Sequence, residues 1–175
     1  GVAGGLVVTV DKLGDLWATD PRTQESRKVN EDKYTHSRFL FGAGAEVYTI
    51  DQDGSLWATD VVAGTWRRLN DAGAFRDTVM GAMAGNELVT IETNGAIYAT
   101  APSGACRRVS TDNYSRTQLI FSGTTRFFTL ENNNLYAVDP ANGSCRQLGG
   151  PGDFANTRLG AGMDESFNFD LAAFS

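Results

Sequence analysis

One pattern recurs in this chain at steps of about 40 residues, and it constrains the fold more than any other feature. A threonine between two apolar residues recurs at Thr9, Thr49, Thr90 and Thr129, which are 40, 41 and 39 residues apart. An aromatic residue followed by alanine recurs at Trp17, Trp57, Tyr98 and Tyr136. A fixed period of this length is typical of repeat proteins, so we predict a chain built from copies of one structural unit.

Each unit is predicted to hold four short strands. In the third unit the segments "DTVMGAMAG", "ELVTIE", "AIYATA" and "CRRVS" have the alternating pattern of strands, and "TNG" and "PSG" separate the last three. Turns of this composition suit tight antiparallel hairpins. Four antiparallel strands in about 40 residues are typical of one blade of a β-propeller. Small residues in the first strand of the unit, such as "FGAGA", favour this arrangement because the innermost strands crowd around the central axis.

The number of units predicts one all-β domain over residues 1–175. Four complete blades are predicted approximately at residues 1–30, 37–71, 77–110 and 116–149. The segments "TRLGAGM" and "ESFNFD" then match the first two strands of a unit, so residues 157–175 are predicted to form an incomplete last blade. The expected fold is therefore a five-bladed β-propeller. The alternative is a four-bladed propeller with a C-terminal extension that packs elsewhere.

Charge and hydropathy narrow the range of partners. The chain has 15 Lys and Arg against 21 Asp and Glu, a net charge of −6, and no Lys/Arg-rich run. Duplex binding needs several cations on one face, so we expect no nucleic acid partner. The longest apolar runs, such as "FLFGAGA", are far shorter than the ~20 residues of a spanning helix. We therefore expect no membrane insertion.

Residues suited to catalysis or metal binding are scarce. The only histidine, His36, lies in a loop between two units, so a nucleophile paired with a base is hard to assemble. Two cysteines and one histidine fall short of the usual zinc ligand sets. Cys106 and Cys145 occupy the same position in consecutive units, farther apart than the ~7 Å Cα separation that a disulfide allows. We expect two free thiols, no metal site, no cofactor and no enzymatic activity.

The loops between the units carry a second recurring aromatic residue with an aspartate close by. The aromatic residues are Tyr34, Phe75, Tyr114 and Phe154, and the aspartates are Asp32, Asp71, Asp112 and Asp153. A ring face beside carboxylate acceptors is a usual way to hold a sugar, since the ring stacks on C–H groups and the acceptors bind hydroxyls. We predict these eight residues as ligand-binding. The alternative is structural, with the ring filling the gap between two blades and the aspartate capping a turn.

Two segments of the fourth unit resemble a known family. "GGPGDFANTRLGAG" and "LYAVD" are similar to the units of the tachylectin-type propeller lectins, which pair a Gly-rich loop ending in an aromatic residue with such a strand. The resemblance implies a five-bladed ring that binds sugars between adjacent blades, with sites around Tyr34, Phe75, Tyr114 and Phe154. Several weak sites would strengthen one another on a glycan-bearing surface.

The expected function is therefore multivalent, lectin-like binding of glycans or glycoproteins. The alternative is a non-enzymatic scaffold that binds a protein partner through one face of the ring. An enzyme with its site at the channel mouth is a third possibility, but the innermost strands offer mostly Gly, Ala and Met. The glycosylation sequons at Asn113 and Asn142 slightly favour an extracellular location, which otherwise stays unknown.

Overall fold

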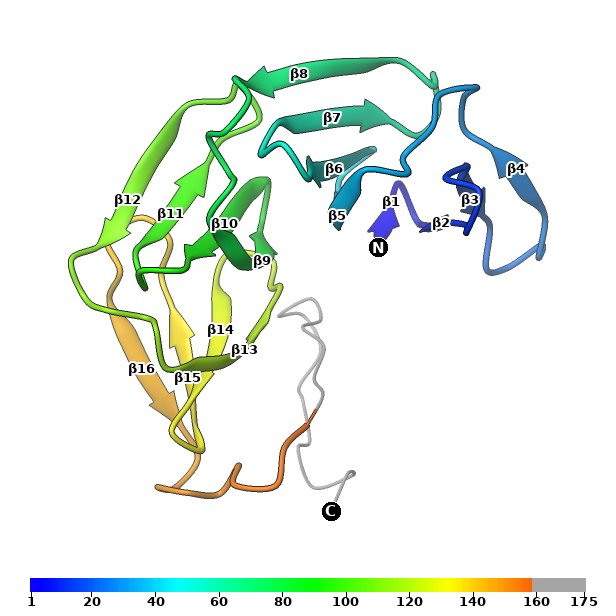
Figure 1. Ribbon diagram of the computed structural model, residues 1–175. Helices are drawn as coiled ribbons and strands as arrows, with labels where there is room; N and C mark the ends of the chain where they lie inside the picture. Colours follow the sequence, from blue (N-terminus) through cyan, green and yellow to red (C-terminus); the bar gives the residue numbers. More distant parts are fainter. Residues whose placement is uncertain (159–175) are drawn as a thin grey trace.

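The computed structural model describes residues 1–158, which form four antiparallel sheets of four strands each (Figure 1). Blade 1 consists of β1 (Val2–Ala3), β2 (Leu6–Val10), β3 (Leu16–Thr19) and β4 (Ser26–Lys28). Blade 2 consists of β5 (Ser37–Ala43), β6 (Glu46–Asp51), β7 (Leu56–Asp60) and β8 (Trp66–Asn70). Blade 3 consists of β9 (Thr78–Ala84), β10 (Glu87–Glu92), β11 (Ile97–Thr100) and β12 (Cys106–Ser110). Blade 4 consists of β13 (Thr117–Phe121), β14 (Phe127–Glu131), β15 (Asn134–Val138) and β16 (Cys145–Leu148).

Each blade is a simple meander, because its strands pair in their order along the chain. The register explains why the threonine and the aromatic residue recur together in the sequence. Thr49 pairs with Trp57 across β6 and β7, and Thr90 pairs with Tyr98 across β10 and β11. The two recurring positions are therefore cross-strand neighbours on one face of each blade.

The core lies between consecutive blades, and both faces of the middle strands contribute to it. Leu88 of β10 packs with Tyr48 and Ile50 of blade 2. The next residue along β10, Val89, points to the opposite face and packs with Phe127 of blade 4. Successive side chains of a strand point to opposite faces, so each inner blade is buried on both sides. This arrangement is why a single unit cannot form a core alone.

Small residues allow the innermost strands to lie close together. Strand β1 lies beside β5, β5 beside β9, and β9 beside β13. A Cβ atom on Gly42 would collide with the backbone of Val2, and one on Gly81 would lie 2.6 Å from the Phe41 ring. The glycines in these strands are therefore a requirement of the close packing between blades.

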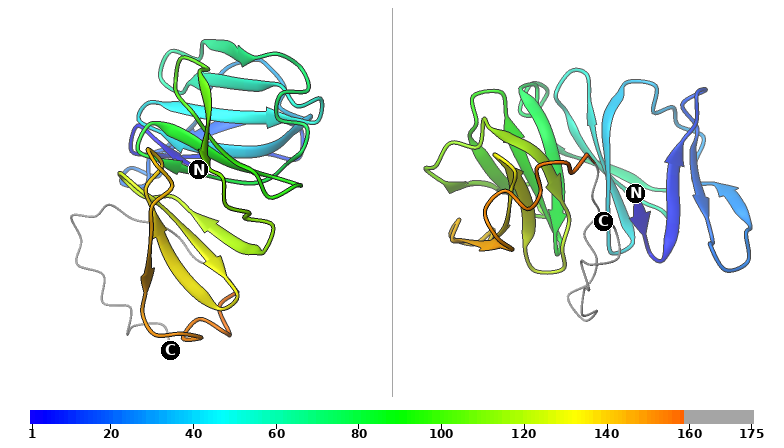
Figure 2. Two further views of the ribbon diagram at one scale, coloured as in Figure 1. Left: turned by 90° about the vertical axis from the view of Figure 1, so that its left-hand side faces the viewer. Right: turned by 90° about the horizontal axis from the view of Figure 1, so that it is seen from below.

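The described residues form an open arc with blade 1 at one end and blade 4 at the other (Figures 1 and 2). The prediction of an all-β chain of repeated four-stranded sheets is confirmed, and the arrangement is consistent with a β-propeller-like fold in which the described sheets do not close into a ring. The incomplete fifth blade was predicted at residues 157–175, which lie almost entirely outside the described residues. Within residues 1–158, no helix is long and apolar enough to cross a membrane.

Candidate functional site

The loops between blades place the recurring aromatic side chains in the junctions between consecutive sheets. The backbone N–H of Tyr34 donates to the carbonyl of Gly14 at 2.7 Å, and that of Phe75 donates to Gly54 at 2.9 Å. Tyr114 makes the same bond to Gly95 at 2.8 Å. In blades 1 to 3 a glycine in the β-turn between the second and third strands thus fixes the position of the ring.

These rings are largely covered by the blades on either side. Phe75 is 3% exposed and Tyr114 is 6% exposed, whereas Tyr34 and Phe154 are half-buried. Burial raises the pKa of the Tyr114 hydroxyl to about 12. Phe75 and Tyr114 therefore have little free ring surface on which a sugar could stack, and their contact with a ligand stays a prediction.

The aspartates near the rings bond within or beside their own loops. The Asp32 carboxylate accepts a hydrogen bond from the Trp66 indole at 2.7 Å, and Asp112 accepts one from the Ser110 hydroxyl at 3.0 Å. Asp153 accepts one from the backbone N–H of Gly150 at 2.6 Å. Asp71 is exposed. The carboxylates of Asp32, Asp112 and Asp153 thus accept hydrogen bonds from protein groups in or beside the loops. Contact of the four aspartates with a ligand also stays a prediction.

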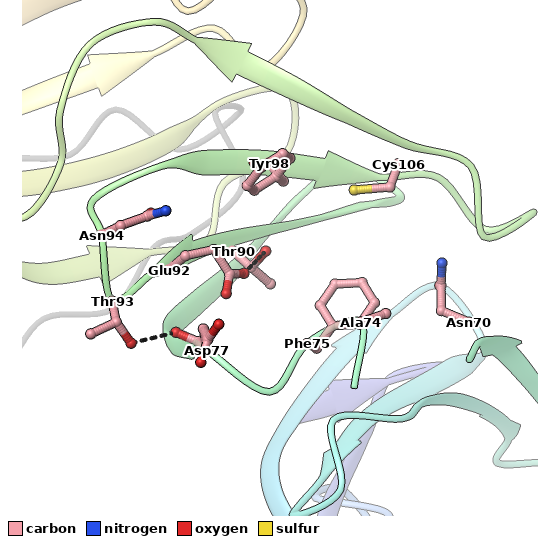
Figure 3. Close-up of a pocket in the computed structure, with 10 residues that line it drawn as sticks. All are labelled: Asn70, Ala74, Phe75, Asp77, Thr90, Glu92, Thr93, Asn94, Tyr98 and Cys106. Carbon is pink, nitrogen blue, oxygen red and sulfur yellow. Dashed lines mark hydrogen bonds between the residues drawn. The ribbon is translucent and has the colours of Figure 1, made fainter. Parts of the chain in front are cut away.

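The structure contains a cavity of about 550 Å³ at the junction of blades 2 and 3 (Figure 3). Its walls come from the β8–β9 loop, from β10 and the turn that follows it, and from β11 and β12. The lining residues are Asn70, Ala74, Phe75, Asp77, Thr90, Glu92, Thr93, Asn94, Tyr98 and Cys106. Its volume lies within the ~300–1,000 Å³ typical of small-molecule sites. We call it the blade 2–3 pocket.

A difference between the repeats explains why space is left at this junction. In blade 2, Trp66 occupies the first position of β8 and packs edge-on against Trp57, with ring centroids 5.1 Å apart. In blade 3 the equivalent positions hold the smaller Cys106 and Tyr98. The volume that two indole rings fill beside blade 1 is therefore partly free beside blade 2.

Two carboxylates give the blade 2–3 pocket an acidic character. Burial raises the pKa of Glu92, and the nearby charge of Asp77 raises it further. The Thr78 hydroxyl donates to Glu92 at 2.9 Å, which works in the opposite direction. Figure 3 shows Asp77 and Glu92 near one another, with Phe75 and Asn70 on the side of the pocket away from Asn94.

The hydrogen bond to Glu92 belongs to a repeated pattern. The hydroxyl of Ser37 donates to Asp51 at 2.8 Å, and that of Thr117 donates to Glu131 at 2.9 Å. In blades 2, 3 and 4 a hydroxyl at the start of the first strand thus bonds to a carboxylate at the end of the second. Of these carboxylates, Glu92 lines the blade 2–3 pocket.

Buried polar atoms near the pocket lack partners. At the junction of blades 1 and 2, the Tyr34 hydroxyl lies 3.1 Å from Thr59 Oγ1 and accepts from Asn30 Nδ2 at 3.0 Å. Phe75 replaces the tyrosine at the next junction. Two buried oxygens there have no hydrogen-bond partner, namely Thr100 Oγ1 and Asn70 Oδ1.

The residues singled out from the sequence therefore do not converge on one site. Phe75 lines the blade 2–3 pocket, while Tyr98, Glu92, Asp77, Asn94 and Cys106 come from positions that sequence reasoning did not select. The signal that could have located the pocket is the replacement of Trp66 by a small residue in the next unit. Cys106 and Cys145 are both free, and both are exposed. Within residues 1–158, no three His, Cys, Asp or Glu side chains are grouped so as to hold a metal ion.

Comparison with solved structures shows the same type of fold in proteins of very different sequence. The chain is similar to PorZ, a bacterial surface component of the type-IX secretion system of Porphyromonas gingivalis, with a TM-score of 0.62 and 12% identity over 86% of this chain and 20% of PorZ. It is also similar to human WBSCR16, with a TM-score of 0.59 and 13% identity over 89% of this chain and 53% of that protein. A computationally designed protein, Ika8, matches with a TM-score of 0.56 and 14% identity over 82% of this chain and 46% of its own.

These similarities concern the fold alone, because each sequence identity is too low to infer a shared function. The chain spans between one fifth and about half the length of these three structures. No protein-family model matches the sequence, and no curated protein matches it either.

Proposed function

We propose that this protein is a lectin-like β-propeller that binds carbohydrate at the junctions between blades and performs no catalytic step. The observation that carries the proposal is the blade 2–3 pocket, which lies where two sheets meet and combines aromatic side chains with several hydrogen-bond acceptors. Sugars present both C–H faces and many hydroxyl donors, so sites for them need this combination.

Individual residues of the pocket suit this ligand class. Tyr98 is half-buried and supplies an aromatic wall on β11. Glu92 and Asp77 supply carboxylate acceptors, and Asn70 and Asn94 supply amides.

Repetition of the junctions supports multivalent binding. Each junction between consecutive blades has a loop of the same design, and the five-bladed ring predicted from the sequence would provide further junctions. Sites that are weak individually gain effective concentration on a surface that displays many glycans. The proposed partners are therefore glycans or glycoproteins at such a surface.

The test is a glycan-array screen of the intact chain together with two matched variants, Cys106→Trp and Cys145→Trp. The first variant should fill the blade 2–3 pocket, since Trp66 fits the same position in blade 2. The second makes the same change at the equivalent position of blade 4, away from this pocket. We expect binding to a defined sugar that is lost in Cys106→Trp and kept in Cys145→Trp.

The two cysteines also provide a direct readout of where the sugar binds. Both thiols are exposed, but only Cys106 lines the blade 2–3 pocket. A bound sugar should slow alkylation of Cys106 by N-ethylmaleimide and leave the rate at Cys145 unchanged, as measured by peptide mass spectrometry. A folded sample that binds no glycan on the array would refute the proposal.

A protein-interaction scaffold is the second candidate, and apolar side chains on the face of blade 1 that no described blade covers favour it. Val2 is 60% exposed and Val7 is 39% exposed. In blades 2 and 3 the equivalent side chains on this face are buried, and one equivalent position is a glycine. Under this function, binding to a protein partner would persist in the presence of free sugars and in the Cys106→Trp variant.

A further inference from the structure

We infer that the blade 2–3 pocket selects saccharides that carry a protonated amine, meaning unacetylated amino sugars, over saccharides that carry a carboxylate. This inference rests on the proposed function and specifies the ligand class of the same site. It is carried by the charges and the hydrogen-bonding groups that line the cavity.

The lining is acidic and contains no side-chain cation. Among the ten residues that line the pocket, Asp77 and Glu92 are acidic and none is Lys, Arg or His. A ligand carboxylate would meet two negative charges without a neighbouring cation to offset them. An ammonium group would be attracted to both, and charge-assisted hydrogen bonds are roughly twice as strong as neutral ones.

Two arginines near the pocket, Arg38 and Arg68, are already engaged by other groups. Arg38 acts electrostatically on Glu92, but its guanidinium donates to the backbone carbonyls of Phe75, Arg76 and Thr78, each at 3.1 Å. Arg68 donates to the carbonyl of Asn70 at 2.9 Å and to the Ser55 hydroxyl at 3.0 Å. A bound anion would have to compete with these backbone and side-chain acceptors for either guanidinium.

The free hydrogen-bonding capacity of the pocket also favours a ligand that donates. Asn70 already uses its amide group to donate to the carbonyl of Gly104 at 3.1 Å, so it offers a ligand little donor capacity. Glu92 lies in an environment that disfavours its charged form, since burial and Asp77 both raise its pKa. A cationic donor beside Glu92 would stabilise the ionised carboxylate, and so offset the unfavourable effects of burial and of the Asp77 charge.

The test compares three soluble trisaccharides by isothermal titration calorimetry at pH 6.5: the β-1,4 trimer of glucosamine, the corresponding trimer of N-acetylglucosamine, and trigalacturonate. We expect the glucosamine trimer to bind at least tenfold more tightly than either of the others. In the double variant Asp77→Asn/Glu92→Gln this preference should fall below about threefold. The control is Glu25→Gln, which removes an exposed carboxylate from the connection between β3 and β4, at a position that does not line the pocket; it should keep the preference.

The possible outcomes separate this inference from the proposed function. Equal affinity for the glucosamine and N-acetylglucosamine trimers, or tighter binding of trigalacturonate, would overturn the inference and leave a carbohydrate-binding pocket in place. A preference for the amine that survives in the Asp77→Asn/Glu92→Gln variant would overturn it too, because the selectivity would then arise elsewhere. If none of the three binds and the glycan array is also blank, the proposed function fails as well.

Discussion

One difference between the first two junctions is a single hydroxyl group. Tyr34 connects Asn30 and Thr59 through its hydroxyl, while Phe75 at the equivalent position cannot reach Thr100 with a polar atom. Thr100 is 1% exposed, so its hydroxyl is also out of reach of water. A buried hydroxyl without a partner carries an unfavourable desolvation energy.

We expect Phe75→Tyr to raise the free energy of unfolding by about 1 kcal/mol, because the new hydroxyl can bond to Thr100 as Tyr34 bonds to Thr59. The reciprocal change Tyr34→Phe should lower it by about the same amount, since Thr59 would lose its partner. Urea denaturation of both variants and the parent measures the two changes. Destabilisation by both substitutions would contradict the interpretation that a hydroxyl is missing at the second junction.

Two glutamates should affect the pH dependence of stability in opposite directions. Burial raises the pKa of Glu92, so its ionisation disfavours the folded state as the pH rises above 4.5. The Arg67 guanidinium, which forms an ion pair with Glu46, lowers the pKa of that carboxyl. Its stabilising contribution is therefore present above pH 4.5 and is lost as the pH falls through the lowered pKa.

The melting temperatures of Glu92→Gln and Glu46→Gln, measured at pH 3.5 and pH 8, test this difference. Relative to the parent, Glu92→Gln should become more stable as the pH rises, since the burial of a charge is removed. Glu46→Gln should become less stable over the same range, since an ion pair is lost. The same sign for both variants would show that the two environments are not distinct.

At the scale of elements, a backbone hydrogen bond connects each blade to the loop that follows its last strand. The turn between its second and third strands holds a glycine at positive φ, at Gly14, Gly54 and Gly95. In blade 4, Asn133 has a φ of 65° and its carbonyl accepts from the backbone N–H of Phe154 at 3.2 Å. Gly and Asn are the residues that adopt this conformation most readily, so the turn sequence determines where the loop can dock.

Gly54→Ala should therefore destabilise the protein more than Gly44→Ala does. Both glycines have positive φ, which costs an alanine roughly 1 kcal/mol. At Gly54 the new Cβ would also lie 2.6 Å from the backbone nitrogen of Arg76, whereas at Gly44 nothing lies within 4 Å. We expect the overlap to add about 1–3 kcal/mol, measured by denaturant unfolding. Equal effects would mean that the contact between turn and loop relaxes freely.

At the scale of the whole molecule, stability depends on contacts between neighbouring blades. Blades 2 and 3 have a neighbour on both sides, and Val47 and Leu88 are 0% and 1% exposed. The equivalent residue of blade 1, Val7, is 39% exposed. In a linear array of repeats, the terminal unit lacks one interface and opens more readily.

Hydrogen–deuterium exchange should reveal this gradient. We expect the amides of β2 and β3 to exchange at least tenfold faster than those of β6 and β10, since within residues 1–158 no blade covers one face of blade 1. The β10 amides of blade 3 serve as the internal reference, because both faces of that strand are packed. Equal protection of blades 1 and 3 would indicate that this face of blade 1 is covered in solution.

The repeat pattern predicted much of the fold, because each recurring position has one structural reason. The threonine and the aromatic residue recur as cross-strand neighbours, and the small residues recur where innermost strands meet. Such local requirements repeat identically in every unit, so they can be recognised in a sequence without a structure. The resemblance to tachylectin-type lectins and the fifth blade stay predictions.

The candidate site could not be predicted in the same way, since it arises where the units differ. Sequence reasoning selected Asp71 and Phe75, but the acidic groups that line the pocket are Asp77 and Glu92, from a loop and a strand. The pocket exists because Cys106 replaces a tryptophan and because the β8–β9 loop faces that position across the junction. The sequence alone determined the unit, its strands and its turns, which depend on neighbours along the chain. Only the tertiary structure decided which side chains share a cavity, because that depends on the volumes left between two separately formed sheets.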